Sequence, residues 1–136
     1  RAQLPTSELS TFFRSVYGDV WEALTRQGLR VVGEPFAAYH GMPSDTVDVE
    51  AGVAVEGTFT GDGDVQASVL PAVRAAVATH VGPYEGLGET WTALQEWAVA
   101  HGHKQERDMF WETYLTDPRE EPDPAAWRTR LVLPVT

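Results

Sequence analysis

A single carboxylate, Glu112, lies inside an aromatic run near the C-terminal end of the chain. Its neighbours Phe110, Trp111 and Tyr114 are aromatic, and a Thr-Asp-Pro turn signal follows at 116–118. Aromatic and β-branched residues are typical of strands. Because an ionised carboxylate in such a run is costly unless it faces water or meets a positive partner, the pattern indicates one of two things. Glu112 is either a solvent-facing residue of an edge strand or the charge of a pocket for a cationic, planar molecule.

Strand alternation sorts these side chains onto two faces. Phe110, Glu112 and Tyr114 share one face, and Trp111 lies on the other, so we expect at most one of Trp111 and Tyr114 to share a pocket wall with the acid. In a dry pocket, desolvation raises the pKa of Glu112 and a bound cation lowers it. Such a carboxyl suits charge recognition and general acid–base chemistry alike.

Two aromatic residues of the second predicted helix, Tyr84 and Trp91, are further candidates for the same wall. They are seven residues apart and therefore face the same way on a helix. Each also has a plain structural interpretation, since Tyr84 can staple the start of the helix and Trp91 has the spacing of a core residue.

Signals for metals and cofactors are weak. The spacing of His80, His101 and His103 lacks a supporting carboxylate pattern, the stretch 61–64 is too short for a calcium loop, and Gly-Leu-Gly at 86–88 lacks the third glycine of a dinucleotide fingerprint. We predict no metal and no cofactor.

Charge and composition exclude several classes of partner. The 136 residues carry 20 acidic and 10 basic side chains, for a formal net charge of −10, and no cysteine. This field repels nucleic acid phosphates, and no apolar run approaches the roughly 20 residues of a membrane span. We therefore expect a cytoplasmic protein without a membrane partner and without direct nucleic acid contact.

Two helical patterns organise the chain. The first begins at a capping residue, Thr6 or Ser7, and ends at Gly28. The second begins at residue 84 or 87 and ends at Gly102. Strand-like runs span 34–40 and 46–56 after the first helix, 69–81 before the second, and 109–115 and 127–135 after it.

The two halves of the chain repeat the same order of elements, which indicates a pair of β-α-β-β units. We expect an α+β fold with one antiparallel sheet and both helices on one face. Repeat one spans about 1–57 and repeat two about 68–136, within a single domain of residues 1–136. No strand-like run precedes the first helix, so the opening strand of repeat one is predicted to be missing unless it lies upstream of Arg1.

The repeat also pairs individual positions of the two halves. Residues 36–39 (Phe-Ala-Ala-Tyr) correspond to 111–114, so Phe36 and Tyr39 are the partners of Trp111 and Tyr114. Ala37 takes the place of Glu112, and the fold unit therefore does not require an acid at that position.

Several sequence segments, in this order and spacing, resemble the GyrI-like small-molecule-binding domain family, which also supplies the effector-binding domain of multidrug-responsive transcription regulators. They are His-Val-Gly-Pro-Tyr at 80–84, Trp-Glu-Thr-Tyr-Leu-Thr-Asp-Pro at 111–118, Asp-Pro at 123–124, Trp-Arg-Thr at 127–129 and Leu-Pro-Val at 133–135.

The resemblance implies a pocket at the junction of the two repeats, centred on Glu112, for lipophilic, cationic or planar drug-like molecules. The aromatic side chains expected to line it are Tyr84, Trp91, Trp111, Tyr114, Tyr39 and Phe36.

Other members imply different activities. One alternative is a hydrolase of reactive electrophiles, such as cyclopropane-bearing DNA-alkylating natural products, with Glu112 as acid or base and Tyr84 assisting. A second is a protein-interaction module that modulates DNA gyrase. A DNA-binding domain before Arg1 would make the chain the effector sensor of a regulator, and its absence would favour a sequestering protein or an enzyme.

Overall fold

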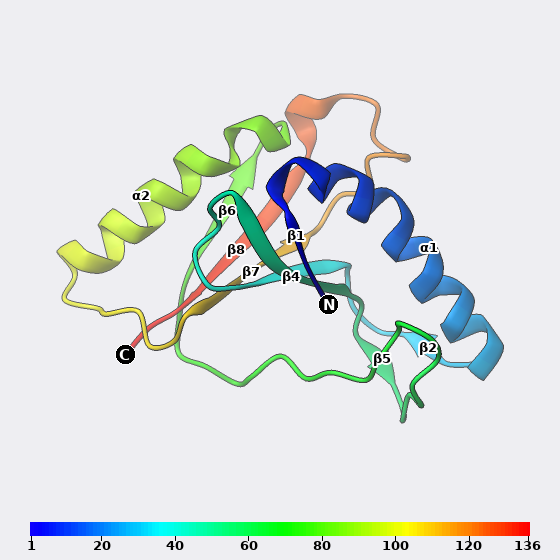
Figure 1. Cartoon of the computed structure of the whole chain (residues 1–136). Helices are drawn as coiled ribbons and strands as arrows, with labels where there is room; N and C mark the ends of the chain where they lie inside the picture. Colours follow the sequence, from blue (N-terminus) through cyan, green and yellow to red (C-terminus); the bar gives the residue numbers. More distant parts are fainter. The chain divides into compact units, whose positions relative to one another are not determined.

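Two α-helices and eight β-strands form the chain, which the computed structural model describes over residues 1–136. They fall into two compact units, Arg1–Pro71 and Ala72–Thr136. In Figure 1, α1 (Leu9–Gln27) is blue and belongs to the first unit, while α2 (Leu87–Ala100) is yellow-green and belongs to the second. Strand pairing within each unit is antiparallel. The predicted α+β class is confirmed, whereas the prediction that the two units act as one ligand-binding domain stays a prediction.

The first unit has an opening strand, so the prediction that it is missing was wrong. β1 (Ala2–Pro5) pairs with β4 (Thr46–Gly52), which also pairs with β3 (Phe36–His40) on its other side. The short strand ends at a proline, and its sequence Ala-Gln-Leu-Pro has no alternating apolar pattern. Its position is instead set by pairing with β4 and by the Arg1 guanidinium, which contacts both oxygens of Asp48 at 2.9 Å.

The predicted side-chain cap of the first helix was also wrong. A 3₁₀ turn, η1 (Thr6–Glu8), precedes α1, and no side chain caps either element. The hydroxyl of Thr6 instead donates to the carbonyl of Ser44 at 2.7 Å, which ties the start of the helix to the turn between β3 and β4. The predicted end is confirmed, since Gly28 adopts the left-handed conformation, with φ of 64°, that ends many helices.

The predicted strand 46–56 is two strands. β4 ends at Gly52, and the chain continues into β5 (Val55–Glu56), which forms a small separate ladder with β2 (Arg30–Val31). A Cβ at Gly52 would lie 3.0 Å from the ring of Phe36, its paired residue on β3, so glycine leaves the space that this ring occupies.

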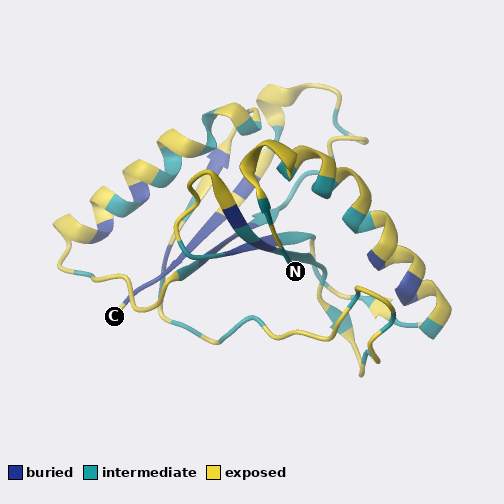
Figure 2. Cartoon of the chain, in the orientation of Figure 1, coloured by how far each residue is buried: buried dark blue, intermediate teal, exposed yellow.

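The second unit has β8 (Arg128–Pro134) at its centre. β8 pairs with β6 (Ala75–Val81) on one side and with β7 (Met109–Tyr114) on the other. The predicted strand 69–81 therefore begins later than expected. Figure 2 shows how burial concentrates on the central strands, where Leu131 and Leu133 of β8 are almost fully covered.

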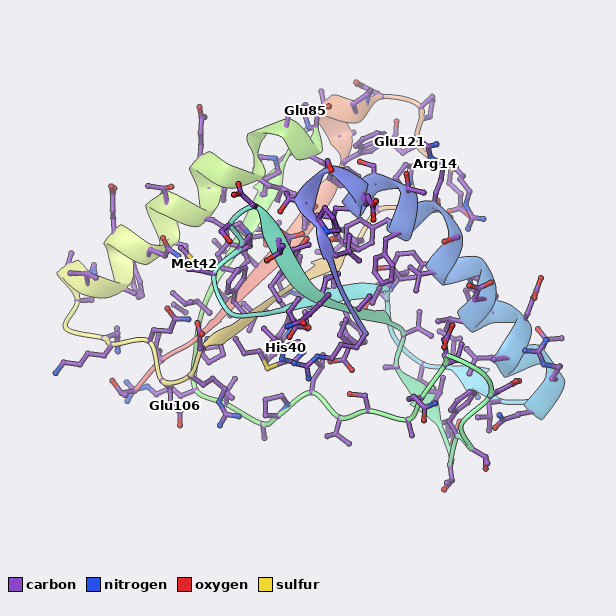
Figure 3. All side chains as sticks on the ribbon, in the orientation of Figure 1. Arg14, His40, Met42, Glu85, Glu106 and Glu121 are labelled. Atoms are coloured by element: carbon purple, nitrogen blue, oxygen red, sulfur yellow. The ribbon has the colours of Figure 1, made fainter.

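A second 3₁₀ turn, η2 (Tyr84–Gly86), leads from β6 into α2 and includes Glu85, which Figure 3 labels. α2 packs on β6 and β8 through Leu94 and Ala98, both buried. The helix therefore covers one face of this sheet. Neither α1 nor α2 combines the length and the apolar character that crossing a bilayer requires.

Candidate ligand-binding site

Glu112 is a buried carboxylate held by two neutral hydrogen-bond donors. Only 6% of its surface is exposed. The indole nitrogen of Trp91 donates to Oε1 at 2.8 Å, and the hydroxyl of Tyr114 donates to Oε2 at 2.9 Å. The contact between Glu112 and Tyr114 agrees with the expectation that they share a strand face. The carboxylate therefore does not face water.

The electrostatic setting of Glu112 is that of a desolvated acid. Burial raises the pKa of Glu112, while the hydrogen bonds from Trp91 and Tyr114 and the nearby His80 act in the opposite direction. None of the salt bridges in the chain includes Glu112. Its partners within the protein satisfy its oxygens without supplying a full positive charge.

Aromatic rings lie on either side of this acid. The ring of Tyr84 meets that of Tyr114 edge-on, with centroids 5.8 Å apart, and packs on Trp127 at 5.0 Å. Trp91 meets Phe110 edge-on at 4.8 Å. We call these six residues the Glu112 cluster: Glu112, Tyr84, Trp91, Phe110, Tyr114 and Trp127.

Tyr84 is itself partly withdrawn from water. Burial, together with the negative charges of Asp117 and Glu112, raises the pKa of its hydroxyl. Tyr84 is therefore a neutral phenol at physiological pH, which can donate a hydrogen bond as well as stack.

His80 of β6 fixes the turn that presents Tyr84. It is buried, its Nε2–H donates to the carbonyl of Pro83 at 2.9 Å, and its Nδ1 lies 2.6 Å from the hydroxyl of Thr90 on α2. The ring also packs closely on Gly86, where an added Cβ would lie 2.9 Å from Cε1. Gly82, with φ of 126°, supplies the left-handed conformation at the start of this turn.

A buried hydroxyl lies between His80 and Tyr114. Thr129 of β8 pairs directly with both residues, so the three side chains form a row across one face of the sheet. Thr129 is fully buried, and its Oγ1 has no hydrogen-bond partner in the protein.

The structure thus gathers four of the predicted site residues, Glu112, Tyr84, Trp91 and Tyr114, in the second unit. Trp111 is buried beside Val132 on the opposite face of β7 and points away from the carboxylate.

Phe36 and Tyr39 belong to β3 of the first unit. The carbonyl of Phe36 accepts a 2.7 Å hydrogen bond from the hydroxyl of Tyr17, and Tyr39 is buried. Their part in the site stays a prediction.

Sequence reasoning missed four contributors: Phe110 and Trp127 as ring partners, His80 as the support of the turn, and Thr129. Three of them lie in the segments 80–84 and 127–129 that carry the family resemblance. That position in the sequence was the available signal. The sequence alone does not give the register of β6, β7 and β8, and this register brings His80, Thr129 and Tyr114 into one row.

A solved structure of EcmrR in complex with DNA is 25% identical, with a TM-score of 0.88 over 99% of this chain and 51% of that chain. This chain thus spans about half the length of that protein. The EcmrR C-terminal domain is 24% identical, with a TM-score of 0.83 over 91% of this chain and 82% of that chain.

A more distant structure, a hydrolase from Listeria innocua, is 19% identical with a TM-score of 0.54, covering 91% of this chain and 77% of that chain. A likeness at this level of identity shows the fold alone. No curated protein matches the chain. The model of the GyrI-like small molecule binding domain matches residues 1–136, the whole of the sequence. The chain belongs to the GyrI-like family of small-molecule binding domains.

Proposed function

We propose that this domain binds lipophilic cations, or planar drug-like molecules that carry positive charge, at Glu112. The observation that carries this proposal is that the carboxylate is buried and has only uncharged hydrogen-bond donors. Glu112 is 6% exposed, burial raises its pKa, and its hydrogen-bond donors Trp91 and Tyr114 are both uncharged. A cationic ligand supplies the charge that these side chains do not, and so favours the ionised form.

The rings of the Glu112 cluster add a second source of affinity. Tyr84, Tyr114 and Trp127 form a contiguous aromatic group next to the acid. A cation over such rings gains on the order of 1–2 kcal/mol per contact when water is excluded. A few contacts of this kind, with one charge pair, correspond to a Kd of about 1 μM and to broad rather than sharp selectivity.

We further propose that the domain works as the effector-sensing part of a transcription regulator. EcmrR, the similar protein that has been solved with DNA, is about twice the length of this chain. A regulator built in the same way would carry its DNA-binding domain upstream of Arg1. The net charge of −10 disfavours direct DNA binding by this segment. A sequestering protein that binds the same ligands is the alternative assignment.

The direct test is binding of tetramethylrhodamine methyl ester, a fluorescent lipophilic cation, followed by fluorescence anisotropy. Glu112→Gln keeps the shape of the side chain and removes its charge. We expect this variant to weaken binding by about tenfold or more, the loss of one charge-assisted contact. Glu89→Gln, an exposed residue of α2, changes the net charge by the same amount and serves as the matched control.

Equal affinity of the wild type and Glu112→Gln would overturn the proposal. So would equal loss of affinity in Glu112→Gln and Glu89→Gln, because the effect would then come from net charge alone.

The hydrolase alternative rests on the raised pKa of Glu112 and on the hydroxyl of Tyr114 at its Oε2, a pair that could exchange a proton with a substrate. It requires turnover. Incubation with a cyclopropane-bearing alkylator and mass spectrometry would reveal a product that has gained one water. Its absence with the wild type under conditions where the dye binds would exclude the hydrolase and leave the binding function standing.

A further inference from the structure

We propose that the hydroxyl of Thr129 is a second polar contact for the ligand, and that it makes the site prefer cations that carry an N–H donor. Protonated amines and amidinium-like groups belong to this class, and fully alkylated cations of similar shape do not. The inference rests on the proposed function, because it concerns which cations bind beside Glu112.

The hydroxyl is on the correct face of the sheet. Glu112 and Tyr114 contact each other and so lie on one face of β7, and Tyr114 pairs directly with Thr129 of β8. Side chains of directly paired residues lie on the same face. Thr129 is therefore a diagonal neighbour of Glu112 on that face.

Tyr114 lies next to both groups. The hydroxyl of Tyr114 occupies Oε2 of Glu112, and Tyr114 stands directly across from Thr129. A ligand that takes the place of this hydroxyl at Oε2 thus arrives beside Thr129. A hydroxyl can accept from such a ligand as well as donate to it.

The first unit shows that the fold itself does not require this hydroxyl. Its row across the sheet is Ala2, Val49 and Tyr39, since Val49 pairs with both of the others. In the second unit the same row is His80, Thr129 and Tyr114. Val49 is fully buried like Thr129, and valine has the shape of threonine without the hydroxyl.

Three polar groups of the site are thus additions to a common unit. His80, Thr129 and Glu112 stand where the first unit has Ala2, Val49 and Ala37. His80 and Glu112 both find hydrogen-bond partners within the protein. Thr129 finds none. A buried hydroxyl without a partner is destabilising, and a native protein that retains one needs a reason. A ligand donor supplies that reason.

The test compares two rhodamine dyes that share the xanthene core, the permanent positive charge and the methyl ester. Rhodamine 123 carries N–H donors, and tetramethylrhodamine methyl ester has none. The quantity measured is the ratio of their Kd values in each variant, so that the difference in size between the dyes cancels. Thr129→Val removes the hydroxyl at constant shape, and Thr129→Ser keeps it.

We expect the preference for rhodamine 123 to fall about tenfold in Thr129→Val, equivalent to about 1.4 kcal/mol, and to persist in Thr129→Ser. Thermal unfolding followed by circular dichroism checks that both variants fold.

An unchanged ratio in Thr129→Val, with both dyes still weakened by Glu112→Gln, would overturn the role of Thr129 and leave the proposed function intact. If neither dye binds the wild type, or if Glu112→Gln has no effect, the proposed function fails and this inference fails with it.

Discussion

The indole N–H of Trp91 and the Oε1 atom of Glu112 are joined by a hydrogen bond of 2.8 Å, across 21 residues of sequence. The bond connects α2 to β7, and the same indole packs edge-on against Phe110 at 4.8 Å. A single side chain therefore fixes the helix to the strand and one oxygen of the acid in place. Any ligand that meets Glu112 meets a carboxylate whose orientation Trp91 has already set.

The substitution Trp91→Phe should therefore change the pH dependence of binding. Cation binding requires ionised Glu112, so affinity falls as pH drops through the pKa of this group. The bond from Trp91 lowers that pKa, and its loss raises it further. We expect the midpoint of dye affinity against pH to move upward in Trp91→Phe, with a loss of about 1–2 kcal/mol in the free energy of unfolding. An identical midpoint in the variant and the wild type would show that Trp91 does not act through Glu112.

Glu112→Gln should stabilise the domain at neutral pH while weakening ligand binding. Burial raises the pKa of Glu112 in the folded state above its ordinary value of 4.5. The folded protein thus holds this proton more tightly than the unfolded chain, and stability is lost as pH rises through the folded pKa. The glutamine of the variant does not ionise, so the variant does not lose stability in this way.

The expected gain at pH 7.5 is on the order of 1 kcal/mol, or roughly 3–4 °C in Tm for a chain of this size. The gain should vanish near pH 4, where the wild-type carboxyl is protonated in both states. Calorimetry at the two pH values checks this, with Glu89→Gln as the exposed control. A gain of the same size at both pH values would contradict the electrostatic explanation.

The contact between Gly86 and His80 predicts a difference between two neighbouring glycines. A Cβ at Gly86 would lie 2.9 Å from Cε1 of His80, whereas a Cβ at Gly88 meets nothing within 4 Å. Gly86→Ala should displace the histidine ring, disturb the turn that presents Tyr84, and cost about 1–3 kcal/mol with weaker dye binding.

Gly88→Ala should be neutral or stabilising by up to about 1 kcal/mol, because alanine favours the helix. Chemical denaturation and dye titration of the two variants provide the measurement. Equal effects of both substitutions would show that the close packing on His80 is unimportant.

The two units also allow a reciprocal exchange of one hydroxyl. Thr129→Val should leave stability unchanged or raise it, because it removes a buried group without a partner. Val49→Thr adds such a group at the corresponding buried position, and we expect it to cost about 1–3 kcal/mol. Unfolding by urea compares them. A loss of stability in Thr129→Val as large as in Val49→Thr would mean that the hydroxyl of Thr129 is satisfied in solution.

Sequence reasoning predicted what local periodicity encodes. The helices follow from apolar residues at spacings of three and four, and their glycine ends from the need for a left-handed residue, as at Gly28. β1 was missed because four residues ending in Pro5 carry no periodic signal. The predicted strand 69–81 began too early, because its apolar run includes Pro71 and only the later residues pair with β8.

The same distinction holds for the site. Alternation along β7 placed Glu112 with Tyr114. The helical spacing of Tyr84 and Trp91 assumed one continuous helix, whereas Tyr84 lies in the 3₁₀ turn before α2. The contacts of Trp127 with Tyr84 and of Thr129 with His80 depend on how three strands align, and no single strand encodes that register. Thr129, the buried hydroxyl without a partner, is therefore a residue that no local pattern marks.

Trp127 connects the Glu112 cluster to the loop before β8. Its ring packs on Tyr84, while its indole N–H donates at 2.9 Å to the carbonyl of Glu121. Glu121 belongs to the proline-rich acidic loop before β8, where Pro118, Pro122 and Pro124 leave few ways for the backbone to bend. The side chain of Trp127 therefore connects the ring of Tyr84 to the backbone of this loop. Because Trp127 joins the two, we expect a ligand that displaces Tyr84 to shift this stiff, negatively charged loop as well.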